Sequence, residues 1–373
     1  MRQVFSGAQV FDGSQLHDDL ALIVEDGLIV GVQTGLRGDV VLDGGVLAPA
    51  FVDLQVNGGG GIMLDGQADA GRIAAICATH ILLGCAGVLP TLITDTPKAT
   101  AQVIQAGIEA AQANVPGFLG LHLEGPHLDP RRKGAHDAAL IRPMGSDDLA
   151  ILLAAAQKLP VLMVTLAPCS VSLDQVRALV KAGVLVSLGH SECSYDEAMA
   201  YIAAGAGCAT HLFNAMAPMA ARAPGLAGAV LDSDLPAGLI ADGIHVAPAV
   251  LRLAMAARPD GLFLVSDCMA FAGTDHTEMV LGGRRIRRDA GRLTLEDCTL
   301  AGADLRLDKA LSVMVQDARL APEKALAMVT STPAKLIGMG GSLGHLAPDR
   351  RADLVHLNRD WQLSQIWWGG VAL

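Results

Sequence analysis

The sequence contains no long apolar run. No stretch of 18 residues is made of apolar residues alone, and the segment LAILLAAAQKLPVLMVTLA (149–167) is interrupted by Lys158 and Pro160. A helix that spans a bilayer needs about 20 consecutive apolar residues. The first 20 residues also lack the apolar segment of a signal peptide. We therefore expect a soluble protein that is neither exported nor inserted in a membrane.

Closely spaced cysteine pairs and an excess of basic residues are also lacking. The seven cysteines are odd in number, scattered, and form no C-x-x-C motif, which argues against a disulfide framework and against a zinc finger. We therefore expect a cytoplasmic protein. The 27 Lys and Arg against 38 Asp and Glu give a formal net charge of −11, and no segment interleaves aromatic with basic residues, which argues against nucleic-acid binding. An anionic ligand must then be held by a few local donors.

The hydrophobic residues that are present follow a regular rhythm. They make up 51% of the chain, enough for a large core. Short runs of Val, Leu and Ile end in a polar residue or a Gly/Pro turn and are followed by segments of helical period. The predicted strands are 46–58, 87–91, 117–125, 160–168, 184–190, 207–213, 237–243 and 261–267. Eight strands separated by helices predict an α/β fold with a TIM-like (β/α)8 barrel, which we assign to residues 49–340.

The two ends of the chain read differently from its centre. ALIVEDGLIVGV (21–32) and GHLAPDRRADLVHL (344–357) show β-like alternation with Gly and Asp turns and little helical period. Because both ends share this pattern, we predict one small β-sandwich domain formed by residues 1–48 and 341–373. The barrel is then inserted between the two parts of this domain.

Polar side chains stand where the predicted strands end. In a (β/α)8 barrel the carboxyl ends of the strands converge on one face, where active sites lie. The residues at these ends are Gln55, Asn57, Thr91, Glu124, His190, His211, Asp242, His245 and Asp267. Glu124, His190 and His211 offer one carboxylate and two imidazoles, a three-ligand set of the kind that catalytic zinc uses. A bound cation would also explain a carboxylate at the end of an apolar strand, since burying it unpaired is unfavourable.

Each of these residues alone has a simpler interpretation. A single histidine more often completes a core or lies on the surface than binds a metal. His122 lies two residues before Glu124 and therefore on the same barrel-inward face, where we expect an interior or supporting position. Asp267 alone could be an ion-paired loop carboxylate. The metal-site hypothesis depends on register, because three separate strands end in potential ligands.

Several longer motifs occur along essentially the whole chain. They are HLEGPHL (122–128), KGAH (133–136), GHS (189–191), THLFNAM (210–216), PGLAGAVLD (224–232), ADGIHV (241–246), VSD (265–267) and TLAGADLRLDKAL (299–311). With these motifs the chain resembles the N-acetylglucosamine-6-phosphate deacetylases of the amidohydrolase superfamily. The resemblance implies a barrel with a small β domain, a homodimer, and metal-dependent hydrolysis of N-acetylglucosamine 6-phosphate to glucosamine 6-phosphate and acetate.

The end of the first barrel strand predicts how many metal ions bind. Many members of the superfamily carry His-x-His there and hold a second metal, whereas this chain reads Gln55-Val56-Asn57. Neutral amides are poor ligands for transition metals. We therefore expect one divalent metal per subunit, with Zn²⁺ as the first choice and Fe²⁺, Mn²⁺ or Co²⁺ as alternatives.

The resemblance also implies catalytic roles for two residues. Asp267 would accept a proton from the attacking water and pass it to the departing amine, as a general base and then a general acid. His136 would polarise the acetyl carbonyl and so help a tetrahedral oxyanion to form.

Substrate contacts are expected from five residues. The resemblance implies that the backbone amides of Asn214 and Ala215, together with Arg222 and His245, hold the 6-phosphate, and that the arginine can come from the partner subunit. A planar guanidinium suits a phosphate. Gln55 is also expected to contact the substrate. The basic runs RRK (131–133) and RRIRR (284–288) receive no role, because charge runs usually form solvated faces.

Two alternatives remain open from the sequence. The same chemistry on N-acetylgalactosamine 6-phosphate differs at one hydroxyl, whose partner the sequence does not identify. A noncatalytic amidohydrolase-like scaffold is an alternative of another class. Such a scaffold should have lost metal ligands or the acid at strand eight, whereas this chain keeps Glu124, His190, His211 and Asp267.

Overall fold

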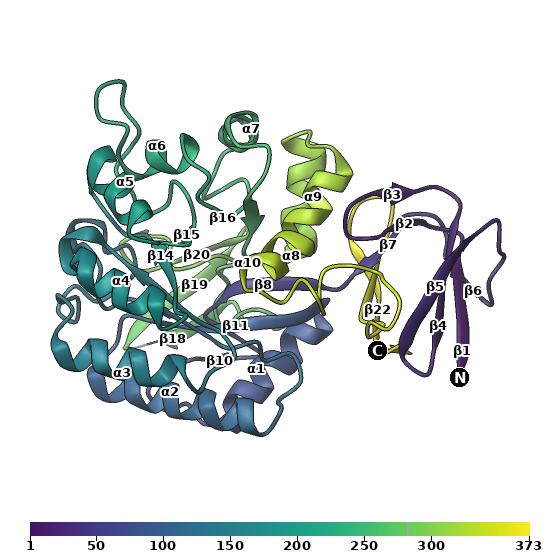
Figure 1. Ribbon diagram of the computed structural model, residues 1–373, viewed down its shortest axis with the longest axis horizontal. Helices are drawn as coiled ribbons and strands as arrows, with labels where there is room; N and C mark the ends of the chain where they lie inside the picture. Colours follow the sequence, from purple (N-terminus) through teal and green to yellow (C-terminus); the bar gives the residue numbers. More distant parts are fainter. Residues whose placement is uncertain (282) are drawn as a thin grey trace.

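Eight parallel strands form the centre of the larger part of the molecule in the computed structural model, which describes residues 1–281 and 283–373 (Figure 1). They are β8 (Phe51–Val56), β11 (Cys85–Ile93), β12 (Leu121–Glu124), β13 (Leu162–Leu166), β14 (Leu185–Leu188), β15 (Cys208–Ala209), β16 (Ala237–Leu239) and β17 (Leu262–Leu264). Neighbours in the sheet follow chain order. The ends meet where Val56 forms a parallel bridge with Cys268. The predicted (β/α)8 barrel is confirmed.

Helices cover the outside of this barrel. They are α1 (Ala70–Leu82), α2 (Pro97–Gln112), α3 (Ser146–Ala156), α4 (Leu173–Lys181), α5 (Tyr195–Ala203), α6 (Gly225–Leu231), α7 (Pro248–Ala257), α8 (Leu307–Ser312), α9 (Pro322–Val329) and α10 (Ser331–Leu336), with a π-helical turn η3 (Val313–Asp317). Their starts are set by local chemistry: at α5, for example, Ser194 and Glu197 form a capping box. No helix in the described part of the chain has the length and apolarity to cross a membrane.

Both termini build a separate pair of sheets beside the barrel (Figure 1). One sheet has the order β5-β4-β1-β6 and the other β23-β22-β21-β7-β2-β3. Their strands are β1 (Arg2–Ser6), β2 (Gln9–Phe11), β3 (Leu16–His17), β4 (Leu20–Glu25), β5 (Leu28–Thr34), β6 (Val40–Val41), β7 (Val46–Pro49), β21 (Leu354–Leu357), β22 (Leu363–Trp368) and β23 (Val371–Ala372). Phe5 of one sheet packs edge to face on Trp367 of the other, with ring centroids 5.1 Å apart. The two sheets therefore share a core, as predicted for a β-sandwich.

The first two predicted strands differ from the structure in ways that affect the site. The run 46–58 is two strands, because β7 pairs with β2 and β21 in the terminal sheet and only β8 enters the barrel. Both are buried throughout, so the apolar run shows no break where the pairing partner changes. The strand predicted at 87–91 continues to Ile93. Thr91 therefore lies inside the barrel and not at the strand end.

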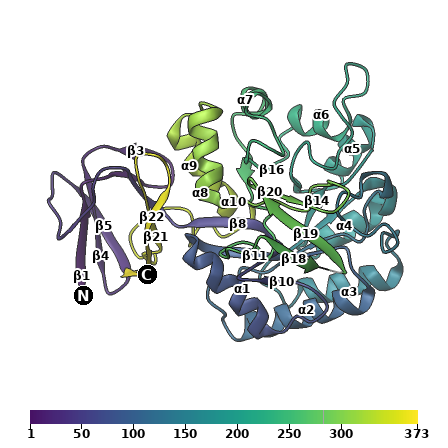
Figure 2. The same ribbon diagram turned by 180° about the vertical axis from the view of Figure 1, so that it is seen from behind.

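A small sheet that the sequence did not predict covers the carboxyl ends of the strands (Figure 2). It consists of β18 (Glu278–Leu281), β19 (Arg284–Asp289) and β20 (Arg292–Thr294). A short pair, β9 (Gly58–Gly59) and β10 (Ile62–Met63), packs on it through Met63. We call β18–β20 the roof sheet. Ile286 and Leu293 of the roof sheet are buried with Met269 and Phe271 in one apolar cluster. Arg288 connects the roof sheet to the neighbouring loops, because its guanidinium donates hydrogen bonds to the carbonyl oxygens of residues 271 and 274 and to Asp304.

Candidate active site

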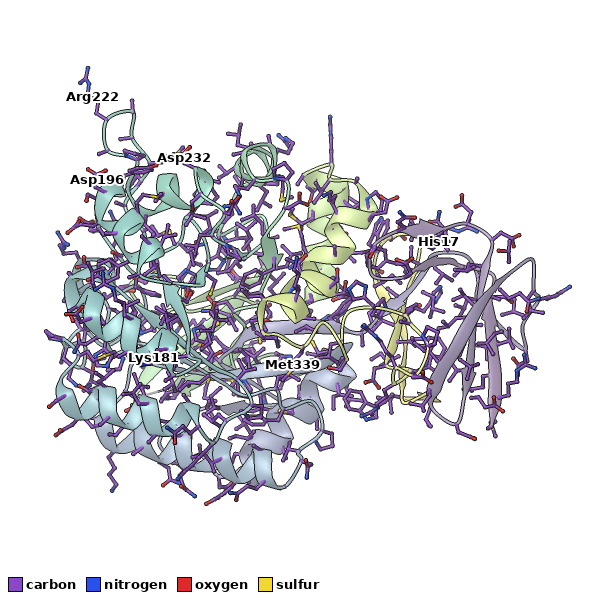
Figure 3. All side chains as sticks on the ribbon, viewed as in Figure 1. His17, Lys181, Asp196, Arg222, Asp232 and Met339 are labelled. Carbon is purple, nitrogen blue, oxygen red and sulfur yellow. The ribbon has the colours of Figure 1, made fainter. Side chains whose placement is uncertain are left out.

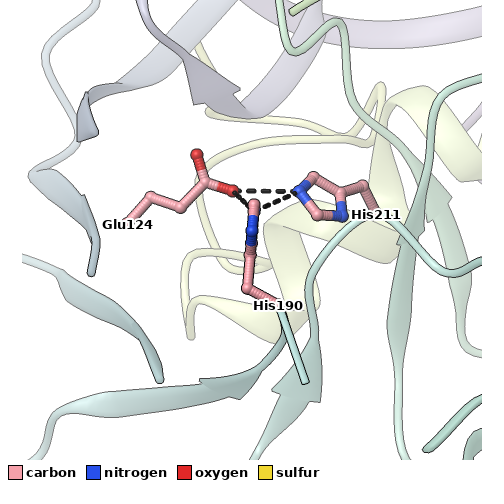
Figure 4. A group of neighbouring side chains, drawn as sticks. All are labelled: Glu124, His190 and His211. Carbon is pink, nitrogen blue, oxygen red and sulfur yellow. Dashed lines mark hydrogen bonds and ion pairs between the residues drawn. The ribbon is translucent and has the colours of Figure 1, made fainter. Parts of the chain in front are cut away.

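Three predicted ligands from three strand ends meet at one point (Figure 4). Oε1 of Glu124 lies 3.2 Å from Nε2 of His190 and 3.0 Å from Nε2 of His211, and the two Nε2 atoms lie 3.1 Å apart. All three side chains are buried. Around a tetrahedral zinc with metal–nitrogen distances of about 2.0–2.1 Å, ligand atoms lie about 3.3 Å from one another. The observed spacing and the donor set therefore fit one such cation.

The protonation of these groups also suits a metal. Burial opposes ionisation of Glu124, but hydrogen bonds with His136, His190 and His211 hold its pKa well below the usual range. Burial and the nearby His136 lower the pKa of His190 to about 4. Against the effect of burial, the contact with Glu124 raises the pKa of His211; a metal binds the deprotonated form of this ring.

Neighbouring backbone fixes the orientation of His190. Its Nδ1 donates to the carbonyl oxygen of Arg132 at 2.8 Å, so Nε2 of a neutral ring keeps the lone pair that a metal needs. The carbonyl oxygen of His190 accepts the N–H of Asp129 at 3.0 Å. The start and the end of the short helix η1 (Pro130–Arg132) are thus hydrogen-bonded to the backbone and to the side chain of His190, respectively.

The backbone is in an unusual conformation at the same strand ends. His190, His211 and Asp267 have φ values of 46°, 25° and 47°. Non-glycine residues seldom adopt positive φ, and such strained positions gather at functional sites. The turns at these residues end the strands abruptly and direct the side chains toward the barrel axis. They also explain why β14, β15 and β17 are shorter than the runs predicted for them.

Asp267 is held beside the ligand cluster by two amides. Nδ2 of Asn57 donates to its Oδ1 at 2.8 Å, and Nε2 of Gln55 donates to the same atom at 3.2 Å and to Oε1 of Glu124 at 3.0 Å. Burial and the charge of Glu124 raise the pKa of Asp267 to about 6. Gln55 does not line the cavity described below, so its substrate contact stays a prediction; its observed role is to connect the two carboxylates.

His136 has a defined tautomer. Its Nδ1 accepts the backbone N–H of Thr94 at 3.2 Å, and the hydroxyl of Thr94 lies 2.8 Å away. A backbone N–H can only donate, so the proton of a neutral ring lies on Nε2, which is 3.7 Å from Oε2 of Glu124. His136 therefore presents an N–H donor to the space in front of the ligand cluster. Thr94 was missed in the sequence because its contact spans 42 residues.

These groups open into a cavity of about 530 Å³ below the roof sheet. Glu124, His136, His190, His211 and Asp267 line it, as do Asn214, Ala215 and His245. The backbone N–H of Asn214 is already bonded to the carbonyl oxygen of residue 211 at 2.9 Å, so its predicted contact with a phosphate stays a prediction. Nδ1 of His245 is bonded to Asp242 at 2.6 Å, which orients the ring. Burial alone would raise the pKa of Asp242, but the hydrogen bond with His245 helps to hold this pKa below its usual value.

Two arginines have positions that the sequence did not indicate. Arg222 lies exposed at the tip of a projecting loop and does not line the cavity of its own chain (Figure 3). Arg284, in the run RRIRR, does line it, and among the described residues it is the one Lys or Arg that does so. The alternation of β19 explains this, since Arg284 and Ile286 share the inner face while Arg285 and Arg287 pair with Glu278 outside.

Comparison with known proteins identifies the family. Residues 46–366 match the amidohydrolase family. The chain is 34% identical to the N-acetylgalactosamine-6-phosphate deacetylase of Shewanella sp. (strain ANA-3) over 99% of this chain and 95% of that protein. It is 37% identical to the human N-acetylglucosamine-6-phosphate deacetylase over 84% of this chain and 80% of that protein. The crystal structure of the N-acetylglucosamine-6-phosphate deacetylase of Pasteurella multocida superimposes with a TM-score of 0.94 over the whole of both chains, at 30% identity. The chain belongs to the amidohydrolase family.

Proposed function

We propose that the protein hydrolyses the N-acetyl group of N-acetylglucosamine 6-phosphate and releases glucosamine 6-phosphate and acetate. One observation carries the proposal: the cluster of Glu124, His190 and His211 shares a cavity with Asp267, and Gln55 connects the two carboxylates. The similar human and Pasteurella multocida proteins carry this activity in their names. Acetate release from the phosphorylated sugar by the purified protein tests it, and no release above a variant without Glu124 would overturn it.

The chain's own residues account for the proton transfers. A bound divalent metal supplies an activated water at neutral pH and polarises the carbonyl. Asp267 accepts the proton of the attacking water and delivers it to the amine nitrogen, because an amine leaves poorly without it. His136 donates its Nε2–H to the carbonyl oxygen as negative charge develops there. Gln55 and Asn57 hold Oδ1 of Asp267 during both transfers.

Protein purified from rich medium should contain about one divalent metal per chain, most simply Zn²⁺. The reason is that the amides of Gln55 and Asn57 are turned toward Asp267 as donors, where a second cation would need acceptors. Elemental analysis against protein concentration measures the ratio. Two tightly bound ions per chain would contradict this prediction, and the ratios of Zn, Fe, Mn and Co identify the native metal.

The 6-phosphate needs a cation, and we propose that Arg222 of a partner subunit supplies it in a homodimer. Arg222 stands on a loop that extends away from its own barrel (Figure 3), as expected of a side chain that acts on a neighbour. In the cavity itself, Asn214, Ala215 and His245 are the residues that we propose lie against the phosphate. A cytoplasmic location suits the cysteines, all seven of which are free thiols.

Arg222→Ala should raise KM for the phosphorylated sugar and lower kcat/KM by about 10- to 10²-fold, since a charge-assisted hydrogen bond contributes roughly 1.5–3 kcal/mol. Hydrolysis of unphosphorylated N-acetylglucosamine should change far less. Arg284→Ala is the matched comparison, because Arg284 is the cation that lines the cavity of the same chain. A larger effect of Arg284→Ala on the phosphorylated substrate would show that the phosphate is held within one chain.

Mixed dimers test whether Arg222 acts across the interface. Subunits carrying Arg222→Ala combined with subunits carrying Asp267→Asn form heterodimers with one site that lacks both groups and one intact site. Activity should therefore reappear on mixing. Confirmed heterodimers without recovered activity would show that Arg222 serves its own chain or has no role.

N-acetylgalactosamine 6-phosphate is a second candidate substrate. The specific observation in its favour is the relative from Shewanella, which is named for that substrate and matches 99% of this chain. The two sugars differ at one hydroxyl, so a single hydrogen-bond partner in the cavity decides between them. Comparison of kcat/KM for both phosphorylated epimers on the same preparation separates the two candidates.

A further inference from the structure

Five polar side chains fill the barrel interior just below the metal ligands. Thr91, His122, Thr165, Ser187 and Thr210 are each at most 1% exposed, and none lines the cavity. They come from β11, β12, β13, β14 and the residue after β15. We call them the hydroxyl layer. A barrel interior is normally packed with branched apolar side chains, so a polar layer at this depth calls for a reason.

Hydrogen bonds join the hydroxyl layer into one chain. Nε2 of His122 lies 2.7 Å from Oγ1 of Thr165, which lies 2.6 Å from Oγ1 of Thr210, and Oγ of Ser187 lies 2.6 Å from Thr210. Nδ1 of His122 approaches Oγ1 of Thr91 at 3.4 Å. The chain thus crosses five neighbouring strands side chain to side chain.

The direction of these bonds follows from the donors. The hydroxyl of Thr91 donates to the carbonyl oxygen of residue 89 and accepts the N–H of residue 56, both at 3.0 Å, so Nδ1 of His122 is the donor toward it. Nε2 then accepts from Thr165. Thr165 in turn accepts from Thr210, and Thr210 accepts from Ser187. Every hydroxyl proton is used, so loss of one link leaves buried groups unpaired on both sides of it.

The hydroxyl layer touches the strands of all three ligands. His122 lies two residues before Glu124 on the same face of β12, and Thr165 is the register partner of Glu124. Thr210 directly precedes His211. Gly189 directly precedes His190, and a Cβ at Gly189 would lie 2.9 Å from Thr165 and 3.0 Å from Thr210. The methyl group of Thr165 and the Cβ of Thr210 therefore occupy the space that a side chain before His190 would need.

We propose that the hydroxyl layer positions Glu124, His190 and His211 for the metal, with Thr165 as its central residue. This inference rests on the metal site of the proposed function but on no particular substrate. The hydrogen bond between Thr165 and Thr210 holds the end of β15, next to His211, against β13, which pairs with the strands that lead to Glu124 and His190. Outer residues that orient metal ligands typically change metal affinity by 10- to 100-fold when they are replaced.

The test measures metal binding without substrate. Co²⁺ is added to metal-free full-length protein, its dissociation constant is obtained by competition with a chelator, and its visible absorption spectrum reports the coordination geometry. Thr165→Val removes one hydroxyl at constant volume and should weaken Co²⁺ binding by about 10- to 100-fold with an altered spectrum. Thr165→Ser should restore both. Gly189→Ala should weaken binding without removing any hydrogen-bonding group. Thr330→Val is the control, since Thr330 is equally buried but donates to residue 326 in α9, away from the site.

Each outcome decides the proposal. A folded Thr165→Val protein that binds Co²⁺ as tightly as the wild type, with the same spectrum, overturns it. If that variant does not fold, Thr210→Val breaks the next link and is measured instead. If neither folds while Thr330→Val does, the layer serves folding and the proposal fails. Wild-type protein that binds Co²⁺ but deacetylates neither sugar phosphate would refute the proposed function and leave this inference standing.

Discussion

Glu124→Gln is expected to lower kcat/KM by about 10³-fold or more and to yield protein without stoichiometric metal. The carboxylate is the one negatively charged member of the ligand cluster, and Nε2 of His190 and of His211 both lie within 3.2 Å of its Oε1. An amide keeps the size of the side chain but is a poor ligand. A metal contributes several kcal/mol to the transition state, and each 1.36 kcal/mol corresponds to a factor of ten in rate.

The matched control for this variant is Glu197→Gln. It makes the same chemical change in the capping box at the start of α5, on the surface of the barrel. Metal content, thermal unfolding and acetate release are measured on all three proteins. A Glu124→Gln protein that retained both one metal per chain and activity within tenfold of wild type would exclude Glu124 as a ligand.

The barrel and the ligand cluster were predictable from the sequence for the same reason. Parallel strands buried on both faces read as short apolar runs, and a polar residue at the end of such a run is exposed to the barrel mouth. Glu124, His190 and His211 follow this rule, so counting strand ends was enough to bring them together. Asp267 follows it as well, at the end of the eighth predicted strand.

The rest of the site depends on contacts that one-dimensional patterns do not contain. Thr94 and Arg132 act on ring nitrogens that belong to distant parts of the chain. Arg284 lies in a run of arginines that resembles a solvated face, and only the alternation of β19 within the roof sheet places it on the side of the cavity. The hydroxyl layer was missed because isolated threonines within apolar strands are common. The hydrogen bonds that join these residues become apparent only when the five strands lie side by side in the barrel.

The position of the roof sheet has a consequence for catalysis. Met269 and residues 301–302 line the cavity together with Arg284 and Ile286, so the roof restricts access of bulk water to Asp267 and the ligand cluster. Charges interact more strongly where water is excluded. Asp267 and Glu124 are both buried carboxylates joined through Gln55, and the charge of Glu124 contributes to the raised pKa of Asp267. A cation bound at Glu124 would offset that charge and favour the ionised form of Asp267. A metal bound at Glu124 and the proposed general base Asp267 are therefore coupled electrostatically.

Asp267→Asn is expected to lower kcat by about 10²- to 10⁴-fold while the metal content stays at the wild-type value. A general base that also serves as general acid typically contributes this much, and an amide can neither accept nor return the proton. The side chain of Asp267 accepts hydrogen bonds from Gln55 and Asn57. Because these partners are not metal ligands, the ligand set should survive the replacement of Asp267. Because the effect is on the transition state, kcat and kcat/KM should fall together.

The pH dependence gives this prediction a second, independent readout. The carboxyl must be ionised to accept a proton, and burial with the nearby charge of Glu124 raises its pKa to about 6. Wild-type kcat/KM should therefore decline on the acidic side of neutrality, at a pH that a bound cation moves lower. The residual activity of Asp267→Asn should lack this acidic limb. Asp232→Asn is the control, because Asp232 accepts a hydrogen bond from Tyr195 outside the cavity. Wild-type turnover in Asp267→Asn, or an unchanged acidic limb at reduced turnover, would assign the proton transfers to another group.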